Sequence, residues 1–150
     1  MKTLHISLLA AMWGMQLSAG SGCAVSGENL SKKGVVKVER VPSERVAIPW
    51  ADVYRSDEGL IVRGVVRRRD YSSQPLLIHV DATVLSGDGE VLTEATGRDL
   101  WVPRRRVGRG FNHVDFEIRL PATAPEGSTV KLVCHPGSRD LHPATDTTRK

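Results

Sequence analysis

The sequence is poor in aromatic residues and cysteine, and it lacks the residue spacings that mark common active sites. Aromatic residues make up 5% of the 150 residues, and there are two cysteines. No Cys-x-x-Cys or His-x-x-x-His pair occurs, so the usual zinc-binding spacings are absent. No Gly-x-Ser-x-Gly elbow occurs either, and no set of residues combines a nucleophile with a base and an oxyanion cradle. We therefore expect a protein that is not an enzyme and has no cofactor.

Long hydrophobic runs are also scarce, and the only notable one lies at the N-terminus. Lys2 precedes an apolar run over residues 4–17, which is followed by small residues at 18–22 and by Cys23. This is the layout of a secretory signal, and the run is too short to span a bilayer permanently. A buried N-terminal helix is the alternative. We predict a signal peptide over residues 1–22 and no other membrane-crossing segment.

The end of this leader resembles the lipobox of bacterial lipoproteins. The resemblance covers residues 1–23, and Gly20 stands where that pattern usually has leucine. It implies that Cys23 is lipidated and anchors the protein to a membrane. Because Ala24 follows and not Asp, it also implies the periplasmic side of the outer membrane. Ordinary cleavage near residues 19–24, which would leave a soluble periplasmic or secreted protein, is the alternative.

The rest of the chain is dominated by period-2 patterns, which are typical of strands with one buried face. Residues 76–85 and 112–120 alternate most regularly, and the turn at 86–89 contains the Asp-Gly pair that favours a tight hairpin. A further strand is predicted at 60–69, where Gly64 suggests a bulge or a close approach of another backbone. Pro49 suggests an edge position or a bulge. Other strands are predicted at 35–41, 46–48, 50–55, 90–93, 98–102 and 129–135.

These segments predict an all-β fold, a single antiparallel β-sandwich of about seven to eight strands. Turn signals recur every 8–12 residues or so, and no segment after the leader has a sustained 3.6-residue stripe. We expect a flexible tether at 23–34, the sandwich at 35–135 and a disordered tail at 136–150. The cadence of residues 62–66, 80–85 and 88–91 resembles immunoglobulin-like and fibronectin-like domains of bacterial envelope proteins. The cysteine pair of antibody domains is absent, and the likeness implies no function.

Two arginine clusters and one tryptophan form the predicted binding surface. The net charge is +4, or +3 without Lys2, which is too mild to indicate a partner. Guanidinium groups pair with carboxylates and phosphates, and tryptophan often anchors an interface. An envelope protein or an anionic envelope component is therefore the expected partner. Nucleic acid is not expected, because no aromatic residues interleave with the arginines. The surface comprises Arg67, Arg68, Arg69, Trp101, Arg104, Arg105, Arg106 and Arg109. Alternatively, these arginines only keep strand edges soluble, and Trp101 packs in the core or over an edge.

The histidines suggest a second function, a periplasmic module that binds a metal or another small ligand. His79 and His113 lie on the outward phases of the two clearest strands, so they are predicted cross-strand neighbours. Cys134 and His135 are adjacent and point to opposite faces of a strand, so they do not easily share an ion. Without a metal, the outward histidines would form modest cross-strand ion pairs with nearby carboxylates.

Cys134 falls on the apolar phase of residues 130–134, where a small buried hydrophobic residue is expected. A disulfide with Cys23 and a metal-binding or reactive thiol are the alternatives.

Overall fold

The computed structural model describes residues 27–41, 43–70, 74–103 and 113–138. Within these ranges the chain forms eight strands and no helix, which confirms the predicted all-β fold. Among the described residues there is accordingly no helical segment of the length and hydrophobicity needed to cross a membrane. The strands are β1 (Val36–Val41), β2 (Val46–Ser56), β3 (Gly59–Arg68), β4 (Leu76–Leu85), β5 (Val91–Thr96), β6 (Leu100–Val102), β7 (His113–Leu120) and β8 (Ser128–Pro136).

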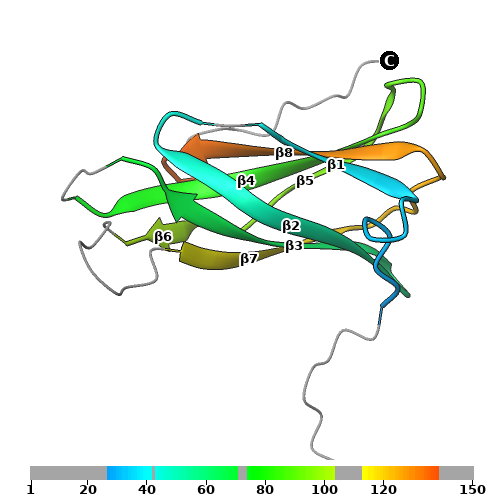
Figure 1. Cartoon of the computed structure of the whole chain (residues 1–150), viewed down its shortest axis with the longest axis horizontal. Helices are drawn as coiled ribbons and strands as arrows, with labels where there is room; N and C mark the ends of the chain where they lie inside the picture. The colour runs from blue at the N-terminus through cyan, green and yellow to red at the C-terminus, as the bar shows by residue number, and fades with distance from the viewer. Residues whose placement is uncertain (1–26, 42, 71–73, 104–112, 139–150) are drawn as a thin grey trace, which may run out of the picture.

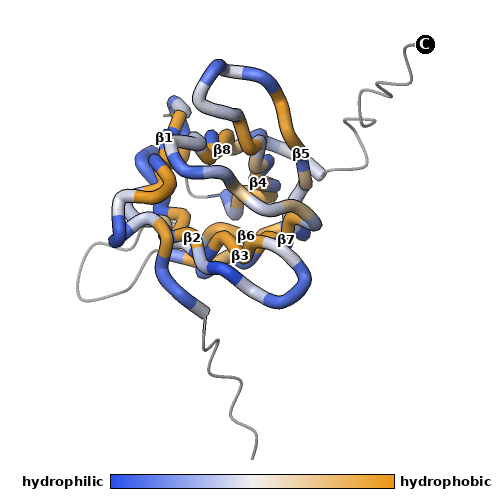
Figure 2. The backbone as a smooth tube through the Cα atoms, turned by 90° about the vertical axis from the view of Figure 1, so that its right-hand side faces the viewer, coloured by the Kyte–Doolittle hydropathy of each residue, from blue (hydrophilic) through white to orange (hydrophobic). Residues whose placement is uncertain are grey.

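The strands form two sheets that pack face to face, as a β-sandwich requires (Figures 1 and 2). One sheet has the order β1-β8-β4-β5, and β6 also pairs with β4 beyond the end of β5. The other sheet has the order β2-β3-β7. Strands β1 and β2 lie on one side of the sandwich, and β5 and β7 lie on the other (Figure 2).

Alternation along the strands fills the space between the sheets. The even-numbered residues of β4, from Leu76 to Val84, are all at most 6% exposed, as the period-2 pattern predicts. Phe116, Ile118 and Leu120 of β7 face them from the other sheet and are also buried. The hydrophobic effect of this inward phase therefore selects the register of each strand, since a one-residue slip would expose the whole set.

Glycine and proline act where the sequence suggested. The β4–β5 hairpin turns at Gly89, whose φ of 85° is in the region that favours glycine. Gly64 of β3 is a point of close approach, because a Cβ there would lie 2.7 Å from the Phe116 ring and 2.7 Å from the Trp50 carbonyl oxygen. Pro49 lies in edge strand β2, where the register with β3 shifts between Ala47 and Trp50. The expected close approach at Gly64 and the expected edge position or bulge at Pro49 are therefore both confirmed.

One pairing departs from the predicted antiparallel arrangement. Strand β1 runs parallel to β8, from the Val36–Ser128 pair to the Val41–Val133 pair. No hairpin joins these two strands, since the whole domain separates them in the chain, and nothing local therefore imposes an antiparallel direction.

The boundaries of the sandwich also differ from the prediction. Leu30, within the predicted tether, is fully buried, and its N–H donates to the Val53 carbonyl oxygen at 2.8 Å. The isolated leucine gave no periodic signal, although it fills the core beside β2. At the other end, β8 reaches Pro136, and the Gly137 N–H donates to the Leu77 carbonyl oxygen at 2.9 Å. Residues 27–34 and 136–138 therefore belong to the fold, whereas 139–150 lie outside the described residues.

Candidate functional site

The first arginine cluster is divided by the alternation of β3. The Arg68 side chain is 0% exposed, and its guanidinium donates to the Asp70 carboxylate and to the Gln74 carbonyl oxygen. The hydrogen bond from Arg68 lowers the pKa of Asp70, with a further contribution from Arg45. Arg68 therefore holds the two ends of the 68–74 segment together and is not part of a binding surface. The sequence contained a sign of this burial, because Arg68 lies on the same phase of β3 as the inward residues Val62 and Val66.

The remaining described members of the predicted surface do not form one patch. Arg67 is exposed on β3, and its inward neighbours are Val66 and Arg68. Trp101 is 63% exposed on β6, between the buried residues Leu100 and Val102. The two side chains therefore leave from the outer faces of different sheets. Arg69 is exposed, and its Nη1 donates to the Ser43 carbonyl oxygen at 3.0 Å. Cys23, Arg104, Arg105, Arg106 and Arg109 lie outside the described residues.

The predicted His79–His113 pair is wrong, because the two residues lie in different sheets. His113 is opposite Arg67 in the β3–β7 pair. His79 is opposite His135 of β8 and is 1% exposed, although its phase is the outward one. Its Nδ1 lies 3.2 Å from the Gly137 carbonyl oxygen, and the two imidazole rings stack at 5.3 Å with an interplanar angle of 19°. Which strand is the neighbour of β4 could not be deduced from the alternation alone.

This histidine cluster is poorly arranged for a metal ion. Imidazole nitrogens coordinate metals through lone pairs in the ring plane, and stacked rings direct these lone pairs along nearly parallel planes. His135 Nε2 instead pairs with Asp81 Oδ2 at 3.2 Å. Across the four described ranges, no group of three or more His, Cys, Asp or Glu residues is placed to hold a metal. His142, the remaining histidine of the C-terminal half, lies outside these ranges.

Cys134 is buried in the core, as the apolar phase of β8 predicts, and among the described residues it is a free thiol. Burial raises its pKa to about 12, and the nearby Asp81 carboxylate contributes to the shift. A thiol of this kind is not a nucleophile at neutral pH.

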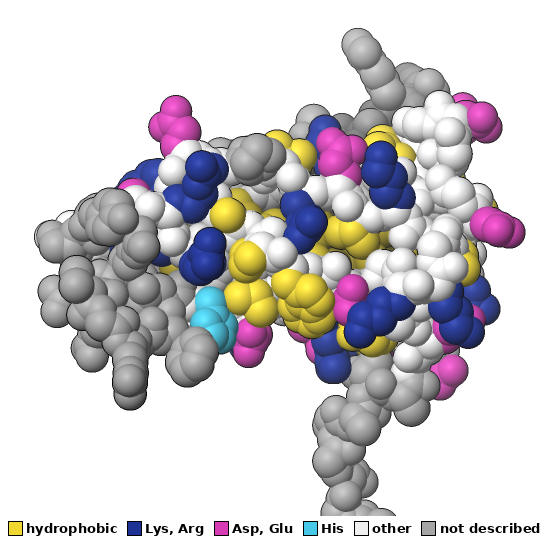
Figure 3. All heavy atoms as spheres, viewed as in Figure 1, with side chains coloured by type: hydrophobic (Ala, Val, Ile, Leu, Met, Phe, Trp, Pro, Cys, Tyr) yellow, Lys and Arg dark blue, Asp and Glu magenta, His cyan; other side chains and the backbone are white. Residues whose placement is uncertain are grey.

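The structure instead reveals a groove on the side of the sandwich where β1 and β2 lie. Strand β1 is an edge strand of one sheet, and β2 is an edge strand of the other. The space between them forms an open groove of about 540 Å³. Figure 1 looks onto this side, and Figure 3 shows hydrophobic side chains there between those of lysine and arginine. We call this feature the β1–β2 groove. Its lining residues are Ser31, Gly34, Val36, Lys37, Val38, Arg40, Trp50 and Ala51.

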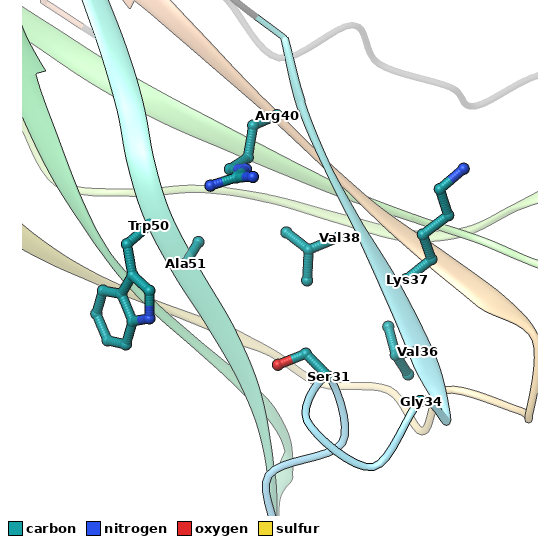
Figure 4. A pocket seen from close by; sticks show the side chains of 8 residues that line it. All are labelled: Ser31, Gly34, Val36, Lys37, Val38, Arg40, Trp50 and Ala51. Atoms are coloured by element: carbon teal, nitrogen blue, oxygen red, sulfur yellow. The ribbon is translucent and has the colours of Figure 1, made fainter.

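The floor of the β1–β2 groove is apolar, and the charged side chains among its lining residues are all positive. Val38 points from β1 towards Ala51 of β2, while the Lys37 side chain points away (Figure 4). Arg40 extends towards β2, where its Nη1 donates to the Pro49 carbonyl oxygen at 2.6 Å. Trp50 contributes to the lining from β2 and is 44% exposed, but its ring lies on the side of β2 that faces away from β1 (Figure 4). No aspartate or glutamate is among the lining residues.

A polar network fixes the end of the groove opposite Arg40. Asp52 is buried beside the 29–34 turn, and its carboxylate accepts a hydrogen bond from Asn29 Nδ2 at 3.0 Å. The Ser31 hydroxyl lies 3.1 Å from the other carboxylate oxygen of Asp52 and accepts from the Val53 N–H at 3.2 Å. Lys32 Nζ approaches the same carboxylate at 3.8 Å. The Asp52 carboxylate, which follows Ala51 of the groove floor in sequence, is thus already engaged with groups of the turn.

The sequence held only a faint sign of this groove. Pro49 followed by Trp50 marked an irregular edge with a large aromatic residue, but neither indicated that β1 lies across from it. Comparisons of the chain with protein-family models, with curated proteins and with solved structures found no match.

Proposed function

We propose that this protein is a non-catalytic binding module of the bacterial envelope, and that it binds another protein at the β1–β2 groove. The single observation that supports this most is the meeting of two sheet edges over an apolar floor with an exposed tryptophan. Soluble proteins usually protect such edges, since they can pair with another chain. Arginine and tryptophan are enriched at the energetically important positions of interfaces, and Arg40 and the exposed Trp50 both lie at this side of the sandwich.

The proposal keeps the exported location indicated by the leader. In it, lipid on Cys23 tethers the module to the periplasmic side of the outer membrane. The partner would then be a protein that is reached from that membrane. A protein is favoured over an acidic lipid, because strand edges offer hydrogen-bonding backbone that a lipid headgroup does not use along its length.

Site-specific photo-crosslinking in the cells of origin tests the proposal. A photoreactive phenylalanine analogue would replace Val38 in the groove or Trp50 at its border. Val91 is the matched control, because it is also an exposed hydrophobic residue, 57% accessible, and belongs to β5, a strand on the opposite side of the sandwich (Figure 2). We expect a discrete crosslinked protein from positions 38 and 50, which disappears when Ala51→Glu is introduced at the groove floor.

The same analogue placed at position 101 tests the alternative, that the partner binds at the surface around Trp101. Crosslinks that form from Trp101 and not from positions 38 and 50 would contradict binding at the groove. They would return the interface to the surface that the sequence first indicated. A groove-specific crosslink that survives Ala51→Glu would equally count against this floor as the contact.

A further inference from the structure

The free edge of β1 points to the form of the ligand. Among the described residues, β1 pairs with β8 along one edge, and no strand pairs with its other edge. That second edge borders the groove from Val36 to Arg40, and only its first donor is engaged, because the Val36 N–H donates to the Leu30 carbonyl oxygen at 3.4 Å. Its outward-pointing N–H and C=O groups are a template for one more strand.

The opposite wall already uses this mode of pairing. Residues 28–30 run along β2 in extended form: the Arg55 N–H donates to the Glu28 carbonyl oxygen at 2.9 Å, and the Leu30 N–H donates to Val53. Asn29 and Tyr54 form an isolated antiparallel bridge. The chain then turns away at 31–34, so this added segment ends where the groove begins. The sandwich is thus completed by its own chain at one end of this side and left open along β1 beyond Val36.

The side chains of β1 define what an added strand would carry. Val36, Val38 and Arg40 share one phase, and Figure 4 shows Val38 and Arg40 directed towards the space between the sheets. In an added strand, three alternate side chains would lie beside these three residues. Two of them would enter the apolar part of the groove. The third would meet the guanidinium of Arg40.

Charge complementarity indicates which type of side chain the added strand would place beside Arg40. Arg40 uses one N–H on the Pro49 carbonyl, whereas a guanidinium has five donors in all. The Lys37 side chain points away from the groove, so Arg40 supplies its positive charge, and no aspartate or glutamate is among the lining residues. A carboxylate can accept two parallel N–H bonds from such a group.

We infer that the groove takes an extended segment of a partner protein that adds to the free edge of β1. Its side chains follow the order apolar-x-apolar-x-acidic, read in either chain direction. The acidic residue pairs with Arg40, one apolar residue covers the partly exposed Val38, and the other packs at the groove end next to the buried Val36. This inference rests on the proposed function and specifies the chemical class of the partner.

The test uses the protein purified from its own envelope and two synthetic peptides, Thr-Val-Thr-Val-Thr-Asp-Thr and its reverse. Calorimetry measures affinity, and amide hydrogen exchange measures protection along β1. We expect one direction to bind and to protect β1. Replacing Asp by Asn in the peptide, or introducing Arg40→Gln in the protein, should weaken binding about tenfold, because each removes a charge-assisted hydrogen bond. Arg98→Gln is the matched control, since Arg98 is exposed and outside the groove.

The outcomes separate this inference from the proposed function. If groove-specific crosslinks form in cells but neither peptide binds, the strand-addition inference is overturned and the groove remains the binding site. Equal affinity for the Asp and Asn peptides would overturn the inference that a carboxylate of the partner pairs with Arg40. Light scattering that finds two copies, with β1 protected before any peptide is added, would overturn it in favour of pairing between copies of this chain. A melting temperature unchanged by Arg40→Gln ensures that lost binding reflects the removed charge.

Discussion

Replacing Gly64 by alanine should destabilise the sandwich, although Gly→Ala in a strand usually helps. Gly64 lies in the central strand of its sheet, opposite Ala51 on one side and Phe116 on the other. The new Cβ would lie 2.7 Å from two atoms of the buried Phe116 ring and 2.7 Å from the Trp50 carbonyl oxygen. Both distances are well inside van der Waals contact. The ring is held by the core, and the carbonyl moves only if β2 moves.

The magnitude follows from two opposing terms. Removing glycine from a strand interior gains roughly 0.5–1 kcal/mol, whereas overpacking a core typically costs about 1–3 kcal/mol. Because backbone as well as ring must shift here, we expect a cost at or beyond the upper end and a net loss of about 2 kcal/mol. For a domain of this size that loss lowers the melting temperature by roughly 8 °C.

Thermal and urea unfolding, followed by circular dichroism, measure this loss. Gly87→Ala is the matched control, because its Cβ would find no atom closer than 3.9 Å, and its effect should stay within about 0.5 kcal/mol. If Gly64→Ala is as stable as the Gly87→Ala control, the close approach of β2 and β7 around Gly64 is not a packing constraint, and the reasoning is refuted.

Three further predictions concern side chains away from the groove. Asp70→Asn should lower the free energy of unfolding in urea by about 3 kcal/mol, because it leaves the buried Arg68 guanidinium without its carboxylate. Arg68→Met removes the buried charge itself and should cost less. A larger loss for Arg68→Met than for Asp70→Asn would contradict this reasoning. Since the pKa of Asp70 is lower in the folded state, its contribution should be complete above about pH 4 and be lost as the pH falls further. Cys134 should not react with a thiol reagent at pH 8 until the protein unfolds, and because its pKa is about 12 in the folded state, stability should fall as the pH rises from about 9 towards 12; rapid labelling of the native protein would count against a buried thiol. Trp101→Ala should change the melting temperature by no more than about 2 °C, because its ring is largely exposed, and a large drop would indicate that the ring packs on the fold.

The sequence predicts the strands well where burial is one-sided and continuous. In β4 and β7 the apolar phase is unbroken, so the strand and its inward face both follow from the alternation. The hairpin at Gly89 and the close approach at Gly64 follow from backbone sterics, which act on the residue itself and need no knowledge of partners. These are local constraints, and local constraints can be read from the chain.

Features that depend on burial by distant residues were not predicted correctly. Leu30 looked like part of a polar tether, yet it is fully buried beside Val53. His79 lies on an outward phase, yet it is buried because β8 supplies a stacked imidazole opposite it. In both cases the environment is supplied by residues more than twenty positions away. Period-2 reasoning gives the direction of a side chain but does not tell what covers it.

The groove belongs to the same class of feature, and this explains why it was missed. Whether a strand is an edge depends on which strands fail to pair with it, and β1 becomes an edge because its partner is β8, the last strand of the domain. That parallel pairing brings Val38 and Arg40 to face Ala51 across the open side. The arginines that stood out in sequence were those in runs, but Arg68 neutralises a local carboxylate, whereas the solitary Arg40 lies beside an unpaired edge. In the binding mode that we propose, the position of a charge relative to free backbone matters more than its density along the chain.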